Sequence, residues 1–397
     1  MEEIKNIDHK ELGKQLDLFS FDENVPGVVY WHAKGWTLFN LIKNDLAKRL
    51  QKDGYKEINS ARIISIETLK KSGHYDNYYD RLFFVGNDKE LTKPKWCLKP
   101  MSCPGGLKIF KEQIHSYKEL PIKISEFGSV YRYEQAGEVN GLFRVRNMTQ
   151  DDAHVYCDES QIEAEIEKLI DFTYETYTRY GFKDIRIELS TRPEKSIGSD
   201  EQWEKAESGL KKALDKKKIE YNINAGDGAF YGPKIDFHIK DSVDRSWQMG
   251  TIQLDFAMAE RLDANYIDNE GNKKHPVMIH RAIFGSIERF TGILLEHTAA
   301  DLPEWLAPVQ VQILPVSEKH IDYAKKIADE LGDIRTEIDE RNESVGRKIR
   351  DAELQKIPYT IVVGDKEIEG KNISVRTRGS KDLKVQKVSE LIAEINK

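Results

Sequence analysis

The sequence predicts an α+β fold built on an antiparallel sheet, followed by a smaller α/β domain. Two stretches, residues 130–146 and 226–256, alternate apolar and polar side chains as half-buried strands do, and each contains a turn-like segment. Beyond residue 308 short apolar strands alternate with helices, which is typical of a largely parallel or mixed sheet. A chain of 397 residues exceeds what one hydrophobic core normally supports, so two domains are expected.

The first predicted domain, residues 25–300, follows an N-terminal extension of residues 1–24. Apolar residues at helical spacing predict a helix from Trp36 to Gly54, where the glycine would cap its end. The aromatic-rich segment 72–85 is interpreted as a packing cluster. The other elements expected, in chain order, are a strand at 55–58, a helix at 66–72, a broken strand running into a helix at 97–110, a helix at 158–181, a strand at 185–189, a helix at 201–217, and a strand passing into a helix at 277–297.

Residues 125–157 predict a hairpin with an unusual density of charge. The arms are expected at 130–133 and 142–146, around a loop at 135–141. One face would then hold Arg132, Arg144 and Arg146 without an obvious matching set of carboxylates. Such a cluster suits a polyphosphate, because each guanidinium meets phosphate oxygens two at a time. A solvated basic face on an antiparallel sheet is the alternative.

The second predicted domain, residues 309–397, follows a linker at 301–308. Its expected strands are 309–316, 334–338, 359–365 and 373–378, and its expected helices end near residues 331 and 355 or begin near residue 387.

Charge, hydropathy and cysteine content restrict the partners and the cellular compartment expected for the protein. The formal net charge of −7 argues against a generally basic nucleic-acid coat, so any nucleic acid would meet local patches. The sequence has no apolar run long enough for a membrane span, and its charged N-terminus lacks the apolar core of a signal peptide. A cytoplasmic protein without a membrane partner is expected. Its three cysteines, Cys97, Cys103 and Cys157, cannot all pair, and disulfides are unlikely in that compartment.

Four pieces of the chain together resemble the class II aminoacyl-tRNA synthetases, and more narrowly the threonyl-tRNA synthetase family. They are LKPMSCPG (98–105), YRYE with RVRNMTQDDAHVYC (131–134 and 144–157), AFYGPKIDF with WQMGTIQLDF (229–237 and 247–256), and VMIHRAIFGSIERF (277–290). The resemblance extends from about residue 25 to the C-terminus, and the last domain resembles that family's anticodon-binding domain. Only the combination is specific.

The resemblance implies one Zn²⁺ per subunit, held by Cys103, His154 and His280. These residues come from three separate segments, and each alone would more often be a buried structural residue. One thiolate and two imidazoles leave a fourth position open, which in this family takes the amino and hydroxyl groups of L-threonine. A pocket that requires a hydroxyl rejects valine well but serine poorly. The residues expected around the amino acid are Met101, Gln150, Asp152, Tyr231 and Ser286.

The reaction implied is attack of the threonine carboxylate on the α-phosphorus of ATP, which arrives with Mg²⁺, followed by transfer to tRNA(Thr). Arg132 matches the arginine on the α-phosphate, Arg289 the arginine on the γ-phosphate, and Lys234 a third catalytic cation. Glu134 matches the residue at the adenine edge. The full set expected at ATP is Arg132, Glu134, Arg144, Met148, Gln248, Thr251, Gln253 and Arg289, with Gln150 and Lys234 at the adenylate, and the anticodon set is Asn342, Arg350, Glu367 and Arg376.

Three positions depart from the family pattern. Ala61 replaces the proline of the first motif, so the expected homodimer interface is predicted to be repacked. Gly106 stands where the family usually has the histidine of CPGH. Met148 replaces a phenylalanine that stacks on adenine, and weaker ATP binding is expected because a thioether covers a base less rigidly.

The sequence before residue 25 contains no histidine and cysteine cluster typical of an editing site. The hypothesis is that the protein makes some seryl-tRNA and either depends on a separate editing protein as a partner or tolerates the error. Two other functions stay open. One is a synthetase-like protein that binds tRNA or senses threonine with weak or no aminoacylation. The other is a different class II synthetase, such as the prolyl or seryl enzyme, which the Cys103, His154 and His280 set disfavours.

Overall fold

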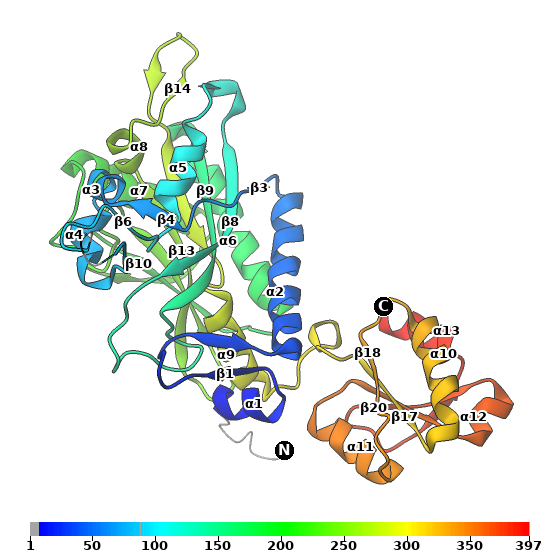
Figure 1. Ribbon diagram of the computed structural model, residues 1–397. Helices are drawn as coiled ribbons and strands as arrows, with labels where there is room; N and C mark the ends of the chain where they lie inside the picture. Colours follow the sequence, from blue (N-terminus) through cyan, green and yellow to red (C-terminus); the bar gives the residue numbers. More distant parts are fainter. Residues whose placement is uncertain (1–7, 88, 90, 397) are drawn as a thin grey trace. The chain divides into compact units, whose positions relative to one another are not determined.

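The computed structural model describes residues 8–87, 89 and 91–396, and the first seven residues of the predicted extension lie outside that part. The described chain divides into two compact units (Figure 1). The first contains residues 21–29 and 42–297, and the second contains residues 8–20, 30–41 and 298–396. Among the described residues, no helix combines the length and apolar character needed to span a bilayer.

An eight-stranded sheet forms the centre of the first unit, and it is antiparallel except at its two edges, where β11 and β3 pair parallel to their neighbours. The α+β prediction is therefore confirmed. In sheet order the strands are β11 (Tyr221–Asn224), β10 (Ile185–Ser190), β12 (Lys234–Lys240), β13 (Ser246–Asp255), β16 (Val277–Ala282), β9 (Asn147–Cys157), β8 (Ile122–Tyr131) and β3 (Lys56–Glu57).

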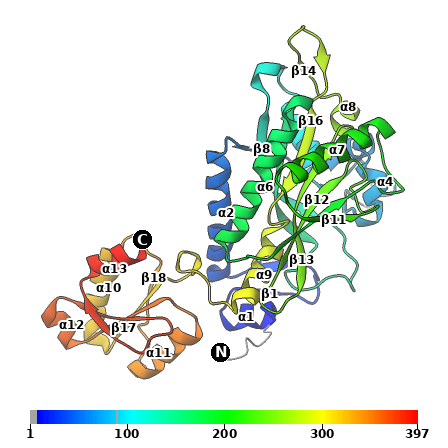
Figure 2. The same ribbon diagram turned by 180° about the vertical axis from the view of Figure 1, so that it is seen from behind.

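Helices α6 (Ile162–Arg179) and α7 (Asp200–Lys216) cover one face of this sheet, as Figure 2 shows. A reciprocal side-chain cap precedes α6, and another opens α7. Asp158 and Gln161 form a capping box in the turn that leads into α6, and Ser199 and Gln202 form one on α7, so that orphan N–H groups at each start are satisfied. The apolar side of β12 and β13 lies on this face, which leaves the other face for polar side chains.

Smaller elements complete the first unit. Figure 1 shows α3, α4, α5, β4 and β6 on the side of the sheet opposite α7. The elements are β4 (Ile63–Ser65), α3 (Ile66–Ser72), α4 (His74–Tyr78), β5 (Phe84–Val85), β6 (Trp96–Leu98), α5 (Cys103–Phe110), β7 (His115–Ser116), α8 (Met258–Arg261), β14 (Tyr266–Ile267), β15 (Lys273–Lys274) and α9 (Ile287–Thr298, whose last residue belongs to the second unit).

Helix α2 (Ala33–Lys52) has residues in both units and begins three residues before the helix predicted from Trp36. Trp36 itself is 51% exposed, so it is not part of the buried stripe that the spacing suggested. Helix α3 matches the predicted bounds, and Gly73 rather than a side chain ends it in the left-handed conformation.

Two strand predictions are wrong in their extent. The second arm of the hairpin begins at Asn147, not at residue 142, because the Arg146 N–H donates to the carbonyl of Gly27 instead of to a neighbouring strand. Residues 132–146 form a looped connection with a single bridge between Asn140 and Arg144. The strand predicted from residue 226 begins only at Lys234. Gly232 packs against the carbonyl of Leu254 too closely for any Cβ, so the chain ahead of β12 is a tight loop.

The second unit contains a five-stranded mixed sheet in the order β18-β17-β19-β20-β21, as its alternating pattern predicted. Its core includes Ile313, Ile361 and Leu391. The elements are α1 (His9–Gln15), β1 (Phe19–Phe21, whose last residue belongs to the first unit), β2 (Val29–Trp31, whose first residue belongs to the first unit), β17 (Val311–Pro315), α10 (Ile321–Leu331), β18 (Thr336–Ile338), α11 (Val345–Leu354), β19 (Tyr359–Val363), α12 (Asp365–Gly370), β20 (Ile373–Thr377), β21 (Lys384–Gln386) and α13 (Val388–Ile395).

Candidate active site

A straight row of polar residues crosses the open face of the eight-stranded sheet. The strand register pairs Ser190 with Lys234, Lys234 with Gln253, Gln253 with His280, and His280 with His154. Side chains alternate along each strand, so residues two positions away share this face. The row and its neighbours therefore bring eight predicted site residues to one surface: Met148, Gln150, Asp152, His154, Lys234, Thr251, Gln253 and His280.

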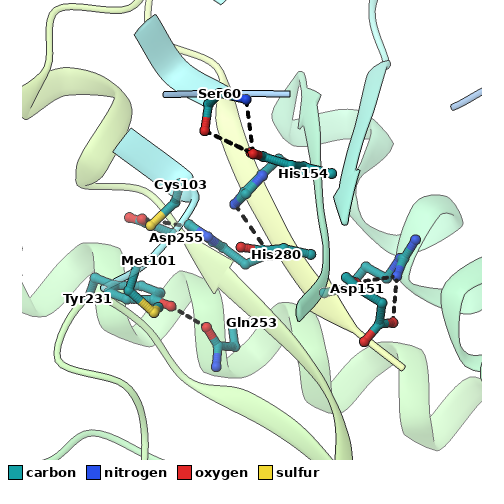
Figure 3. A network of polar contacts seen from close by, with 12 residues as sticks. Ser60, Met101, Cys103, Asp151, His154, Tyr231, Gln253, Asp255 and His280 are labelled. Carbon is teal, nitrogen blue, oxygen red and sulfur yellow. Dashed lines mark hydrogen bonds and ion pairs between the residues drawn. The ribbon is translucent and has the colours of Figure 1, made fainter. Parts of the chain in front are cut away.

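Cys103, His154 and His280 converge at one end of this row (Figure 3). Cys103 is the first residue of α5, and the two histidines come from β9 and β16. One ligand atom from each lies within 4.8 Å of the others, and all three residues are buried. Zinc bound at 2.0–2.3 Å from nitrogen and sulfur brings ligand atoms into this range.

The protonation of Cys103 and His154 bears on whether this cluster can hold a cation. Burial raises the pKa of the Cys103 thiol, and the carboxylates of Asp152 and Asp255 raise it further. Burial also lowers the pKa of His154, so this imidazole is neutral with a lone pair, and its Nε2 has no hydrogen-bond partner among the described residues. A dication at this position would satisfy that buried nitrogen and stabilise the thiolate. The residues therefore fit the expected zinc.

Asp255, which the sequence did not single out, orients His280. Its Oδ2 lies 3.1 Å from Nε2 of His280, and its Oδ1 accepts the N–H groups of Ala257 (2.7 Å) and Met258 (3.0 Å) at the start of α8. With the Nε2–H donated to the carboxylate, Nδ1 keeps the lone pair. Asp255 is fully buried, whereas the sequence shows only an aspartate at the end of an alternating strand.

His74 is a second residue of the site that the sequence analysis missed, since it lies in the segment interpreted as a packing cluster. Its Nε2 is 3.4 Å from the sulfur of Cys103, and its Nδ1 is 2.8 Å from the hydroxyl of Ser72. Burial lowers the pKa of His74 to about 3, so it is neutral. The segment contains many aromatic residues, so its single histidine was interpreted as part of their packing.

The residues predicted around the amino acid take different places. Tyr231 is buried, donates its hydroxyl hydrogen to the side chain of Gln253, and lies with its ring 4.8 Å from that of His280 (Figure 3). Asp152 has an oxygen 3.8 Å from Nε2 of His154, and burial raises its pKa to about 6. Met101 packs against the cluster that contains Cys103.

Gln150 and Ser286 complete that predicted set. Gln150 lies on β9 opposite Gly128. Ser286 instead accepts the N–H of Arg289 at 3.1 Å, at the start of α9.

Arg132 and Arg289 are both held by neutral groups. Arg132 donates to the carbonyl of Pro100 at 3.1 Å and to the sulfur of Met101 at 2.8 Å. Arg289 donates to the carbonyls of Phe143 and Gln248, both at 3.3 Å. The described contacts of these two guanidiniums include no carboxylate, so their positive charge is available to an anion.

Arg144 of the predicted arginine cluster does have matching carboxylates, which corrects the sequence analysis. Glu134 is buried, with an oxygen 2.7 Å from Arg81 and 4.0 Å from Arg144. Glu138 lies 3.6 Å from each of the same two arginines. Arg146 donates to the carbonyl of Glu134 at 2.9 Å. The loop between β8 and β9 is therefore largely charge-balanced, because its acidic residues fold back onto it.

The three departures from the family pattern also have places in the structure. Gly106 lies over the ligand cluster, since a Cβ there would be 3.3 Å from Tyr156 Oη and 3.6 Å from His154 Nδ1. Met148 lies on the polar face, opposite Val130. Ala61 is exposed.

The four residues predicted at the anticodon differ in how they are held. Glu367 caps the start of α12 by accepting the Gly364 N–H at 2.9 Å and also accepts the Ser374 hydroxyl at 2.7 Å. Arg376 pairs with Glu353 at 2.5 Å. Asn342 and Arg350 are exposed.

Comparison with known families agrees with this architecture. Residues 85–298 match the model described as the tRNA synthetase class II core domain (G, H, P, S and T), and residues 310–397 match the anticodon binding domain. The chain belongs to the class II aminoacyl-tRNA synthetases.

Within that class the chain belongs to the threonyl-tRNA synthetase family. It is 48% identical to a threonine–tRNA ligase of Clostridium tetani and 47% identical to one of Finegoldia magna, over the whole of this chain but 62% of each relative. A solved structure titled as the RNA binding domain of threonyl-tRNA synthetase from Cryptosporidium parvum superposes with a TM-score of 0.94 at 38% identity, over 98% of both chains. The chain thus spans less than two thirds of the length of these curated relatives.

Proposed function

We propose that this protein joins L-threonine to tRNA(Thr) in two ATP-dependent steps. The observation that carries the proposal is the convergence of Cys103, His154 and His280 on the sheet face that also bears Asp152 and Gln253. The family and the threonine–tRNA ligases among its relatives support the same substrate. Residues 25–300 would form the catalytic domain, and residues 309–397 the anticodon-binding domain, where Asn342, Arg350, Glu367 and Arg376 are the proposed contacts.

Cys103, His154 and His280 would hold the zinc ion, which when bound accepts the amino and hydroxyl groups of threonine at its open position. Asp152 would accept a hydrogen bond from the amino group of the amino acid, since one of its oxygens lies 3.8 Å from Nε2 of His154. Tyr231 closes the pocket, because it is buried and its ring faces His280. A pocket arranged in this way leaves valine with an unfilled polar position, whereas serine fills it and loses only a methyl contact, worth about 1–3 kcal/mol.

In the first step an oxygen of the threonine carboxylate attacks the α-phosphorus of ATP, the bond to the β-phosphate oxygen breaks, and pyrophosphate leaves with Mg²⁺. Arg132 and Arg289 supply positive charge without a competing carboxylate, as their contacts with carbonyl groups and a thioether indicate. In the second step a hydroxyl of the terminal ribose of the tRNA displaces AMP from the adenylate.

Amino-acid-dependent exchange of pyrophosphate into ATP tests this function on the purified, metal-assayed chain. Exchange should be strongest with threonine, weaker with serine and nearly absent with valine and proline. Cys103→Ala should lose both bound zinc and exchange. A folded, zinc-loaded protein that shows no exchange with any amino acid would instead be a synthetase-like binding protein.

The proposal includes a homodimer, to be tested by the mass of the protein in solution. A mass equal to 45.9 kDa would contradict it.

A further inference from the structure

A buried carboxylate with no role in the reaction outlined above lies beside Lys234. Asp236 is two residues along β12 from Lys234 and is 1% exposed. Its Oδ2 lies 2.7 Å from Nζ of Lys234 and accepts the hydroxyl of Ser190 at 2.8 Å. Its Oδ1 has no hydrogen-bond partner among the described residues. Burying a carboxylate costs free energy unless the charge is paired with a cation and its oxygens accept hydrogen bonds.

Lys234 is held by two carboxylates of different character. Asp236 is fixed in the sheet, whereas Asp227 comes from the loop before β12, is 57% exposed in its side chain, and lies 3.0 Å from the ammonium group. The side chain of Lys234 is itself only 12% exposed. An ammonium group has three donors, and these two carboxylates account for two of them. The exposed partner is the one that an incoming anion would displace at lower cost.

The position of Lys234 connects this pair to the active site. Lys234 is paired across the sheet with Gln253, and Gln253 is paired with His280. Neighbouring strands are about 4.8 Å apart, so the Cα of Lys234 lies roughly 10 Å from that of His280. A side chain of this length reaches an amino acid or phosphate bound between them.

We propose that Asp236 is a positioning residue, which fixes the Lys234 ammonium group at the site of adenylate formation while a substrate phosphate takes the place of Asp227. This inference rests on the proposed function. Ser190 completes the arrangement, because its hydroxyl holds the same carboxylate oxygen that meets the lysine. The competing interpretation is that the Asp236 and Lys234 pair only braces β10 against β12.

The pKa of Lys234 provides a quantity that an experiment can follow, through the pH dependence of the reaction rate. Burial acts to lower the pKa of Lys234, but Asp236 and Asp227 outweigh burial and raise this pKa above its usual value. The groups that face the ammonium are these two carboxylates, with the neutral side chains of Gln253 and Ser190 on the adjoining strands. Replacing Asp236 with a neutral isostere removes one of the two carboxylates that raise the pKa of Lys234, while burial still lowers it. Lys234 should therefore lose its proton at a lower pH.

Asp236→Asn should be tested by threonine-dependent pyrophosphate exchange between pH 6.5 and 9.5, with melting temperature and zinc content measured on the same protein. We expect kcat to fall about 10- to 100-fold, as displacement of a catalytic group by about 1 Å does, while KM for threonine stays within about twofold. The rate should also decline at a lower alkaline pH than in the wild type. Asp236→Glu should restore the wild-type pH profile.

Glu188→Gln is the matched control. Glu188 lies directly opposite Asp236 on β10, but its carboxylate contacts His238 and Arg186 rather than Lys234. The control removes the same charge one strand away and should keep both rate and pH profile.

Three results would overturn the inference. Asp236→Asn with wild-type kcat would show that Lys234 does not need this carboxylate. A loss of rate that is equal at every pH and is accompanied by a lower melting temperature would show that the pair braces the sheet. A wild-type chain without exchange would refute the proposed function itself, which separates that failure from the other two.

Discussion

Asp255→Asn is the substitution that most directly tests how the metal cluster is built. Asn retains an oxygen that can accept the N–H groups of Ala257 and Met258, so the cap of α8 can persist. Its amide nitrogen, however, presents hydrogens to the Nε2–H of His280, which now lies 3.1 Å from a carboxylate oxygen. The ring must then lose this hydrogen bond or move its proton to Nδ1, the nitrogen that would hold the metal while Nε2–H faces Asp255.

Loss of such a supporting carboxylate typically lowers metal affinity by about 10- to 100-fold. This corresponds to about 1.4–2.8 kcal/mol of binding free energy. The assay is the zinc dissociation constant, measured by competition with a chelator at fixed pH. Asp158→Asn is the control, because Asp158 caps the turn before α6 through the N–H of Ser160 and is not part of the cluster. Unchanged zinc affinity in Asp255→Asn, or an equal loss in the control, would refute the reasoning.

Three further predictions concern ATP, pH and folding. Met148→Phe should lower KM for ATP about two- to tenfold, since an aromatic ring stacked on a base contributes roughly 0.5–1.5 kcal/mol more binding free energy than a flexible side chain. Titrating ATP in the pyrophosphate exchange assay checks this, and an unchanged KM would contradict it. Burial raises the pKa of Glu288 from 4.5 to about 7, so between these pH values the folded state holds more protons than the unfolded state. The free energy of unfolding therefore falls as pH rises through that window. In urea unfolding, Glu288→Gln should show a smaller fall with pH than the wild type, by at most a few kcal/mol, and parallel pH curves for the two proteins would refute this. Ile361→Ala, at a fully buried position of the second unit, should cost that unit about 2–5 kcal/mol, whereas Leu383→Ala, at a 57% exposed position, should cost under about 0.5 kcal/mol when chemical denaturation is compared.

Local pattern alone was enough for most regular elements. The bounds of α3 follow from Ser65, whose side chain caps the first turn, and from Gly73, which ends the helix in a conformation that favours glycine. The mixed sheet of the second unit follows from short apolar strands alternating with helices. Both signals act over a few residues, so they can be detected without knowledge of the fold.

The extent of the hairpin was decided by distant contacts. Residues 142–146 alternate as a strand would, but the N–H of Arg146 meets the carbonyl of Gly27, which is more than a hundred residues away in sequence. The same holds for charge. Arg144 seemed to lack a carboxylate partner, yet the fold places Glu134 and Glu138 against it.

The sequence by itself determined the fold class and, through the family motifs, which residues to expect at the site. Only the tertiary structure decided how they meet: strand register sets Lys234, Gln253, His280 and His154 in one row, because hydrogen bonding between strands fixes which residues lie opposite each other. Supporting residues such as Asp255 act through a partner elsewhere in the chain. They carry no local signal, since a buried aspartate and an exposed one are the same letter in a sequence.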